Sequence, residues 1–256
     1  MSALTADDTA FLVALAERAG AAIMAVYQGD IVVSQKADKS VVTAADTAAE
    51  AVILAGLAER FPHIPVVAEE SVAAGRCPTV GERFFLVDPL DGTREFISRN
   101  GEFTVNIALI EQGVPVAGVV TLPALGTAYW TGGDGVAWRR DGGGTVAIAC
   151  RAVPAAGASV VASRSHRDEA TDAFIATLTV KDLVSAGSSL KFCRLAEGRA
   201  DIYPRFGRTM EWDVAAGHAV LRAAGGSVTG ADGTAFRYGK PGWDNPAFIA
   251  RGLGNA

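Results

Sequence analysis

The sequence predicts a layered α/β fold in one compact unit, with an α+β half at residues 1–145 and an α/β half at residues 146–256. Two observations lead to this fold class. Amphipathic helical spacing in the first 60 residues gives way to short apolar runs, which are typical of strands. After the glycines at 142–144, strand-like and helix-like segments alternate, as they do in α/β proteins. With 256 residues, 50% of them apolar, the chain can bury a sizeable core.

Two helices are predicted in the first quarter of the chain. Apolar residues recur at helical spacing over residues 7–27, and this segment ends at Gly29. The second helix begins at Thr43, because Thr43 and Asp46 have the spacing of a capping box. It ends at the Phe61-Pro62 pair, since the residue before a proline disfavours helical geometry. On this interpretation two helices precede any strand.

Strands are predicted where a short apolar run is bounded by turn residues. In the first half, these runs occupy residues 64–68, 84–87, 103–110, 114–122 and 129–138. Gln112-Gly113 suits a hairpin turn between the third and fourth runs. Glycines at 132, 133 and 135 divide the last run, so we expect a second strand pair there.

The second half is predicted to alternate strands with helices. The strands are expected at residues 159–162, near Leu183, at 201–203 and at 248–250. The helices are expected to begin at Arg167, Ser188 and Trp212, and the last of them runs to Ala224. The change of pattern falls between residues 141 and 154, where no linker is long enough to separate independent domains.

Charge and cysteine content limit the class of protein. The chain has 23 basic and 28 acidic residues and a net charge of −5, which argues against a nucleic-acid partner. Three distant cysteines, Cys77, Cys150 and Cys193, suggest neither a disulfide framework nor a zinc site. Neither an export signal nor 18 uninterrupted apolar residues is found. We therefore expect a cytoplasmic protein without a transmembrane segment.

The most informative stretch is Asp88-Pro89-Leu90-Asp91-Gly92-Thr93, which directly follows a buried apolar run. Proline restricts the backbone between the two aspartates, and Gly92 permits a sharp turn, so two carboxylates and a carbonyl can converge. Such oxygen ligands suit Mg²⁺. The alternative is a plain surface turn, since each of these residues is a common turn former.

Two further acidic clusters follow or open regular elements. Glu69-Glu70-Ser71 comes after the apolar run at 64–68, and Glu211-Trp212-Asp213 opens the last predicted helix. Three acidic clusters at the ends of separate elements are hard to explain as solvated surface, which favours a shared site. Trp212 and His218 are expected to pack in the core rather than to act chemically.

Taken together, Glu69-Glu70-Ser71, Asp88-Pro89-Leu90-Asp91-Gly92-Thr93 and Trp212-Asp213-Val214-Ala215-Ala216-Gly217 resemble the motifs of the inositol monophosphatase superfamily of Mg²⁺-dependent, lithium-sensitive phosphatases. Stretches at residues 94–97, 100–107, 163–166, 187–193 and 203–207 are similar to bacterial 3'(2'),5'-bisphosphate nucleotidases within it. The likeness covers nearly the whole chain. It implies a sugar-phosphatase fold, the layered α-β-α-β-α sandwich of the inositol monophosphatase and fructose-1,6-bisphosphatase type.

The resemblance implies a two-metal site. Glu69, Asp88 and the carbonyl of Leu90 would hold one Mg²⁺, and Asp88, Asp91 and Asp213 would hold a second. A third Mg²⁺ per site is the alternative. A phosphate monoester is anionic, so its approach and the charge on the leaving oxygen both require neutralisation by metal.

The resemblance also implies a carboxylate that activates water together with the hydroxyl of Thr93. Asp46 is one candidate for this base and Glu69 is the other, and the sequence does not separate them. Thr43 and Asp46 have the alternative role of a helix cap, described above.

For substrate binding, the resemblance to nucleotidases favours His166, Ser188, Lys191 and Arg205 as contacts to a nucleotide and its second phosphate. The transferred phosphate would lie among Glu69, Leu90, Asp91, Gly92, Thr93 and Asp213. An ordinary helix cap at Ser188, with Lys191 on the exposed face, is the alternative for that pair.

The expected reaction is hydrolysis of the 3'-phosphate of adenosine 3',5'-bisphosphate to AMP and phosphate, in sulfur metabolism, with the sulfated precursor as a further substrate. The nearest alternative is a phosphatase for inositol phosphates or another small sugar phosphate. A non-catalytic protein that binds Mg²⁺ or nucleotide is the alternative from another class. We expect a small-molecule substrate, a monomer or homodimer, and a cytoplasmic location, with peripheral contact with the inner membrane as the alternative.

Overall fold

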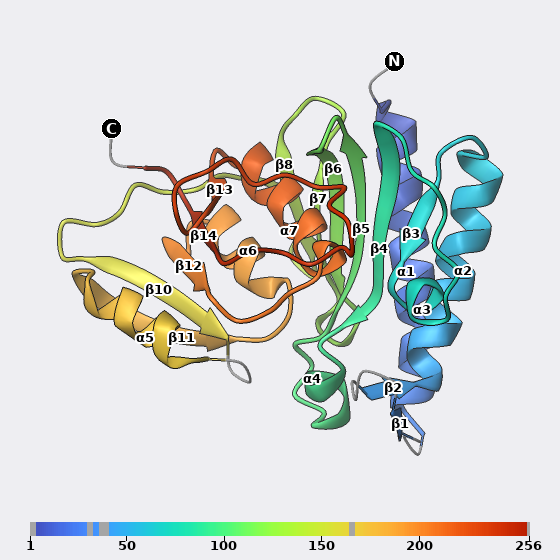
Figure 1. Ribbon diagram of the computed structural model, residues 1–256, viewed down its shortest axis with the longest axis horizontal. Coiled ribbons are helices and arrows are strands. Elements are labelled where there is room, and N and C mark those ends of the chain that lie inside the picture. Colours follow the sequence, from blue (N-terminus) through green and yellow to red (C-terminus); the bar gives the residue numbers. More distant parts are fainter. Residues whose placement is uncertain (1–3, 30–32, 36–40, 164–166, 255–256) are drawn as a thin grey trace.

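Five layers make up the molecule, and they alternate between helices and sheets (Figure 1). The computed structural model describes residues 4–29, 33–35, 41–163 and 167–254. Helices α1 and α2 cover one face of a seven-stranded sheet, and α6 and α7 lie between that sheet and a five-stranded sheet. Helix α5 covers the outer face of the smaller sheet. This order confirms the predicted α-β-α-β-α sandwich.

Helices α1 (Ala6–Tyr27) and α2 (Ala44–Arg60) begin at capping boxes, as their sequences require. Thr5 pairs with Asp8 at the start of α1, and Thr43 pairs with Asp46 at the start of α2. The prediction that two helices precede any strand is wrong, because β1 (Val33–Gln35) and β2 (Val41–Thr43) form an antiparallel pair between them. Strands of three residues are too short to show an alternating pattern.

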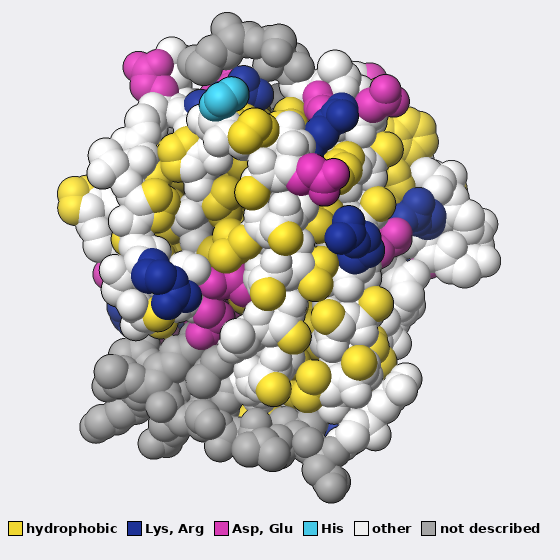
Figure 2. Space-filling model, turned by 90° about the vertical axis from the view of Figure 1, so that its right-hand side faces the viewer, with side chains coloured by type: hydrophobic (Ala, Val, Ile, Leu, Met, Phe, Trp, Pro, Cys, Tyr) yellow, Lys and Arg dark blue, Asp and Glu magenta, His cyan; other side chains and the backbone are white. Residues whose placement is uncertain are grey.

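Helix α1 is, in the described part of the chain, the one helix long and apolar enough to cross a membrane. Its buried side chains, among them Leu12, Leu15 and Ile23, face α2 and the strands β5 and β6. Packing in the core therefore accounts for its apolar composition. On the face of the molecule that carries α1 and α2, acidic and basic side chains are interspersed with apolar ones (Figure 2).

The seven-stranded sheet has the strand order β3-β4-β5-β6-β7-β8-β9. The predicted hairpin at Gln112-Gly113 is confirmed, and so is the strand pair around residues 132–135. The last strand extends past residue 145, the expected limit between the halves. The strands are β3 (Val66–Ala68), β4 (Arg83–Asp91), β5 (Thr104–Glu111), β6 (Val114–Leu122), β7 (Thr127–Thr131), β8 (Ala137–Asp141) and β9 (Gly144–Ile148), with a short 3-10 helix at Pro123–Leu125.

The five-stranded sheet has the strand order β11-β10-β12-β14-β13. Strand β10 pairs in parallel with β11 and β12, which confirms the predicted alternation of strands and helices. Strand β13 was not predicted, because its four residues are surrounded by glycines and resemble a loop. The elements are β10 (Ala158–Ser163), α5 (Glu169–Ala176), β11 (Val180–Ala186), α6 (Leu190–Ala196), β12 (Ile202–Arg205), α7 (Glu211–Ala223), β13 (Ser227–Gly230) and β14 (Phe248–Arg251).

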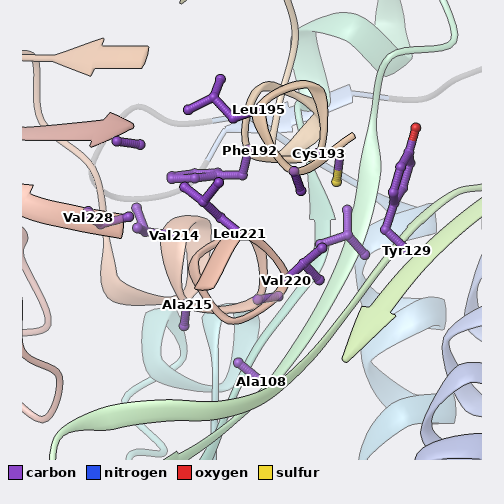
Figure 3. Close-up of a cluster of buried hydrophobic side chains, with 14 of the residues drawn as sticks. Ala108, Tyr129, Phe192, Cys193, Leu195, Val214, Ala215, Val220, Leu221 and Val228 are labelled. Atoms are coloured by element: carbon purple, nitrogen blue, oxygen red, sulfur yellow. The ribbon is translucent and has the colours of Figure 1, made fainter. Parts of the chain in front are cut away.

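The layer of α6 and α7 is held by very close contacts on both sides. Phe192 of α6 stacks on Phe248 of β14, and Figure 3 shows Phe192 beside Leu221 and Val214 of α7. On the side of the large sheet, a Cβ at Gly118 would lie 2.5 Å from the main-chain oxygen of Ala216. A side chain at Gly118 would therefore force α7 away from β6. These contacts fix the start of α7 relative to both sheets.

Candidate active site

Two acidic segments are brought together by a parallel strand pair. Strands β3 and β4 run in parallel with Ala68 opposite Val87, so the next residues, Glu69 and Asp88, emerge at the same edge of the sheet. The short helix α3 (Glu69–Ala73) starts directly there. The third acidic segment arrives with α7, which begins at Glu211. The predicted convergence of separate acidic clusters thus has its structural basis.

The segment Asp88–Asp91 bends out of regular strand geometry. Asp88 lies opposite Asn106, but Asp91 lies opposite Thr104, so the register shifts between the two aspartates. The Leu90 amide donates to Asp88 Oδ1 at 3.1 Å. This bulge turns both carboxylates toward the same side of the sheet edge. The alternative of a plain surface turn is wrong, because Asp88 is only 2% exposed.

Gly92 is required at the end of this bulge. Its φ angle is +90°, and a Cβ there would lie 2.0 Å from Ser188 Oγ. Helix α4 (Thr93–Ile97) follows immediately, so Thr93 begins a turn of helix above the acidic residues. The close approach of Gly92 and Ser188 joins the large sheet to the turn that precedes α6.

The acidic groups share one electrostatic environment. Burial raises the pKa of Asp88 well above its ordinary value, and the charges of Glu69, Asp91, Asp213 and Asp46 raise it further. Burial likewise raises the pKa of Asp213 well above its ordinary value, with Asp91 and Glu69 adding to the effect. Asp46, Glu69, Asp91 and Asp213 therefore all lie near Asp88.

The pKa of Asp91 is set by opposing influences. Burial raises it, while the nearby charge of Lys191 and hydrogen bonds from Ser189 lower it. Thr104 Oγ1 and Asn106 Nδ2 also approach Asp91 Oδ2, at 3.4 and 3.5 Å. Several donor groups therefore surround the Asp91 carboxylate.

The donor set fits a divalent cation. Within the described ranges, no three His, Cys, Asp or Glu side chains form a group that could already hold a metal ion. Carboxylates that are buried together and raise one another's pKa are, however, the groups a hard cation would stabilise. Glu69, Asp88, Asp91, Asp213 and the carbonyl of Leu90 could therefore hold Mg²⁺ by closing around it.

Asp46 caps α2, as predicted. Its Oδ2 accepts hydrogen bonds from the amide and the hydroxyl of Thr43, at 2.7 and 2.8 Å. Asp46 is 2% exposed and close enough to Asp88 to raise its pKa. The cap places this carboxylate next to the acidic cluster, so the two roles foreseen for it are compatible.

A cleft of about 310 Å³ opens above the acidic cluster. Asp88 and Leu90 lie buried below it, and His166 lies outside the described residues. The expected site residues that line the cleft are Glu69, Asp91, Gly92, Thr93, Ser188, Lys191, Arg205 and Asp213. The cleft is thus lined by three carboxylates and, close to them, by the cationic side chains of Lys191 and Arg205.

Lys191 is placed differently from an ordinary helix-surface lysine. Helix α6 begins only at Leu190, and Lys191 is 5% exposed, so the alternative of a cap at Ser188 with an exposed Lys191 is wrong. Lys191 Nζ donates to the carbonyl of Ser188 at 2.7 Å and to that of Ala186 at 3.4 Å. Burial lowers the pKa of Lys191 to about 8. The ammonium group therefore stabilises the turn before α6 while it faces the cleft.

Several cleft residues were not predicted as site residues. Arg94, Glu95, Tyr203 and Arg208 line the cleft, and Arg208 pairs with Asp244 at 2.6 Å. Arg205, which was predicted, donates to the carbonyl of Arg208 at 3.0 Å. The sequence marks Arg94 and Glu95 by their position directly after Asp91-Gly92-Thr93, whereas Arg208 has no spacing signal and becomes visible only in the fold.

Helix α7 carries the acidic cluster Glu211-Trp212-Asp213 and also His218. Trp212 and His218 are buried at 5% and 6% exposure, so packing is confirmed for both. Glu211 points away from the cleft and accepts hydrogen bonds from the amides of Gly239 and Lys240. Asp213 Oδ2 accepts from the Met210 amide at 2.8 Å. Only Asp213 of this cluster therefore faces the other carboxylates.

Comparison with known proteins agrees with this arrangement. The sequence model of the inositol monophosphatase family matches residues 5–251. The 3'(2'),5'-bisphosphate nucleotidase CysQ of Salmonella typhimurium is 50% identical over 226 residues, which cover 88% of this chain and 91% of the relative. The CysQ of Escherichia coli is 48% identical over 228 residues, with the same coverage of both chains.

Solved structures show the same fold. The crystal structure of CysQ from Bacteroides thetaiotaomicron superposes with a TM-score of 0.81 at 36% identity and covers 96% of this chain and 97% of that chain. The IMPase of Thermotoga maritima gives a TM-score of 0.79 at 26% identity and covers 96% and 92% of the two chains. The layered fold thus has solved counterparts.

Proposed function

The chain belongs to the inositol monophosphatase family, and on that premise we propose that it is a 3'(2'),5'-bisphosphate nucleotidase, a metal-dependent phosphatase. Its substrate is adenosine 3',5'-bisphosphate, whose 3'-phosphate it hydrolyses to give AMP and phosphate. The observation that carries this proposal is about 50% identity with CysQ nucleotidases over 88% of the chain. The sulfated precursor is a second substrate of the same kind, which would place the enzyme in sulfur metabolism.

The composition of the cleft supports a substrate with two phosphate groups. Glu69, Asp91 and Asp213 line the cleft together with the cationic side chains Lys191 and Arg205. Metal ions held by the carboxylates would neutralise one phosphate, whereas a second phosphate needs a cationic contact of its own. The predicted substrate contacts Ser188, Lys191 and Arg205 line the same cleft, and we expect His166 to be a further contact.

Glu69, Asp88, Asp91, Asp213 and the Leu90 carbonyl would hold two Mg²⁺ ions, with a third as the alternative. When bound, these ions supply charge neutralisation at the phosphoryl group and lower the pKa of the attacking water. The bulge at 88–91 and the starts of α3 and α7 bring these residues near one another, and we expect their side chains to close around the ions.

A carboxylate beside Thr93 takes the proton from the attacking water. The Thr93 hydroxyl lines the cleft together with Glu69. Asp46 is the second candidate, since it is buried next to Asp88 and already accepts a hydroxyl hydrogen bond from Thr43. A hydroxyl relay from water through Thr93 to Asp46, or direct transfer to Glu69, would both use side chains that are present.

A phosphatase for inositol phosphates or other small sugar phosphates is the second candidate, favoured by the likeness to the Thermotoga maritima IMPase. The two candidates share the acidic end of the cleft and differ in the need for Lys191 and Arg205. Phosphate release should be measured with adenosine 3',5'-bisphosphate, inositol 1-phosphate and fructose 1,6-bisphosphate, with Mg²⁺, EDTA or Li⁺. We expect the nucleotide to be preferred and the activity to be lost with EDTA and reduced by Li⁺. Preference for inositol 1-phosphate would overturn the nucleotidase assignment.

We further propose that this is a soluble enzyme of the cytoplasm, with peripheral contact with the inner membrane as the alternative. The mixed charges over the face of α1 and α2 suit contact with water (Figure 2). A monomer and a homodimer are both consistent with this site, because its described lining residues come from one chain.

A further inference from the structure

Helix α2 carries a second buried carboxylate, Glu50, one turn after Asp46. Glu50 is 4% exposed and faces the start of α3 rather than the cleft. Its Oε2 accepts a hydrogen bond from the amide of Glu70 at 2.8 Å, and its Oε1 accepts one from Ser71 Oγ at 2.6 Å. Both carboxylate oxygens are therefore used to hold the segment that contains Glu69.

We propose that Glu50 is a positioning residue that fixes Glu69 at the metal end of the cleft, an inference that rests on the proposed function. Helix α3 begins at Glu69, and its N-cap residue, Ala68, has no side chain that could accept from the first amides. Glu50 supplies that acceptor from a different helix. The direction of the Glu69 side chain then depends on a hydrogen bond that Glu69 does not itself make.

The same contact links the two candidate bases. Asp46 and Glu50 lie four residues apart on α2, so both project from the same face of that helix. Asp46 reaches toward Asp88, while Glu50 holds the turn that carries Glu69. Asp46 and Glu69 both lie close enough to Asp88 to raise its pKa. Glu50 thus connects the helix that carries Asp46 to the segment that carries Glu69.

A buried carboxylate in this role is costly to alter. Glu50→Gln retains the size of the side chain but replaces one acceptor oxygen by an N–H donor, which would face either the Glu70 amide or the Ser71 hydroxyl. Either the hydrogen bond from the Glu70 amide would weaken, or α3 would rotate and Glu69 would move with α3. Loss of outer hydrogen-bond partners of metal ligands typically lowers metal affinity by about 10- to 100-fold.

The experiment compares Glu50→Gln with Glu59→Gln, an exposed glutamate on the same helix that serves as the control. For each variant, Mg²⁺ binding is measured by titration calorimetry, and the rise in Tm on addition of Mg²⁺ is measured separately. Phosphate release from adenosine 3',5'-bisphosphate gives kcat, KM and the Mg²⁺ concentration for half-maximal activity. These readouts separate metal affinity from nucleotide binding.

We expect Glu50→Gln to weaken Mg²⁺ binding about 10-fold or more, to reduce the Mg²⁺-induced rise in Tm, and to lower kcat while leaving KM for the nucleotide nearly unchanged. High Mg²⁺ should restore part of kcat. Unchanged Mg²⁺ affinity and unchanged kcat in Glu50→Gln would overturn the proposal.

Ser71→Ala provides a second, milder variant in case Glu50→Gln does not fold, because it removes only the hydroxyl contact to Oε1. A several-fold loss of Mg²⁺ affinity is expected, and wild-type affinity in this variant would also count against the role of Glu50. If the wild-type protein binds Mg²⁺ but releases no phosphate from the nucleotide, the proposed function fails. The calorimetric comparison then still decides the role of Glu50.

Discussion

The hydroxyl of Ser188 donates a hydrogen bond to the main-chain oxygen of Asp91 at 2.8 Å. Its neighbour Ser189 donates through Oγ to the main-chain oxygen of Asp213 at 2.9 Å. Two adjacent serines therefore bind the end of β4 and the start of α7, which come from different parts of the fold. Lys191 supports the same turn through the carbonyl of Ser188. The relative position of two proposed metal ligands thus depends on three side chains that need not touch a metal.

Ser189→Ala should weaken Mg²⁺ binding and should lower the free energy of unfolding only slightly. Loss of one buried hydrogen bond costs about 1 kcal/mol of unfolding free energy. Asp213 loses a main-chain contact and Asp91 loses a donor, so the Mg²⁺ concentration for half-maximal activity should rise several-fold. Ser227→Ala on the exposed edge of β13 is the control. An unchanged Mg²⁺ requirement would show that Ser189 does not hold Asp213.

Gly92→Ala should impair both stability and activity, whereas Gly135→Ala should impair stability alone. Both glycines have positive φ angles, of +90° and +78°, so alanine costs about 1–3 kcal/mol at either position. Only at Gly92 would the new Cβ also collide with Ser188 Oγ; at Gly135 nothing lies within 4 Å. Urea unfolding and phosphate release measure the two effects. Equal activity loss in both variants would contradict the steric explanation.

Asp213→Asn should reduce kcat without unfolding the protein. Burial and the neighbouring charges of Asp91 and Glu69 raise the pKa of Asp213, so removing its charge relieves repulsion in the metal-free protein. We expect the Tm without Mg²⁺ to stay the same or rise, and the increase of Tm with Mg²⁺ to shrink. The loss of kcat should exceed the roughly 10- to 100-fold loss typical of an outer hydrogen-bond partner. Wild-type turnover at saturating Mg²⁺ would remove Asp213 from the proposed metal site.

His218 should make the protein less stable in acid. Burial, together with the nearby charge of Arg222, lowers its pKa to about 3 from an ordinary value of 6.5. Between these two values the unfolded chain binds a proton that the folded protein does not, so the free energy of unfolding falls as pH falls. The slope contributed by this residue approaches about 1.4 kcal/mol per pH unit.

Urea unfolding between pH 7 and about 4 measures this contribution. His218→Gln, which cannot take up a proton, should show a shallower decline than the wild-type protein, whereas His63→Gln at an exposed turn should not. In the wild type, His218 Nδ1 lies 3.0 Å from the Tyr238 hydroxyl, so the substitution also alters one hydrogen bond at every pH. Parallel curves for His218→Gln and wild type would exclude His218 as the source of the acid sensitivity.

Much of the fold could be predicted from local rules. The capping box at Thr43 and Asp46, the hairpin at Gln112-Gly113 and the alternation of strands and helices after residue 157 all depend on neighbouring residues. The pair β1–β2 and strand β13 escaped prediction, because strands of three or four residues show too few alternations to be recognised.

The acidic part of the site could be predicted because carboxylates that directly follow strands are visible in a linear sequence. The contacts that support it were not visible. Glu50 shares the buried face of α2 with Ile53 and Leu57, but its partners on α3 cannot be read from that spacing. Lys191 was expected to contact a nucleotide, and its two carbonyl partners depend on the turn at 186–188. Such contacts arise from long-range packing, which no local pattern records.

The absence of a side chain at Gly118 limits how the substrate specificity of this enzyme could change. Because β6 and α7 touch backbone to backbone there, α7 cannot tilt without carrying the large sheet with it. The position of Asp213, at the start of α7, is thereby coupled to the carboxylates that extend from the large sheet. Adaptation to another phosphate ester is left to the exposed rim, where Arg94 and Arg208 can be exchanged while the chemistry beneath them stays intact.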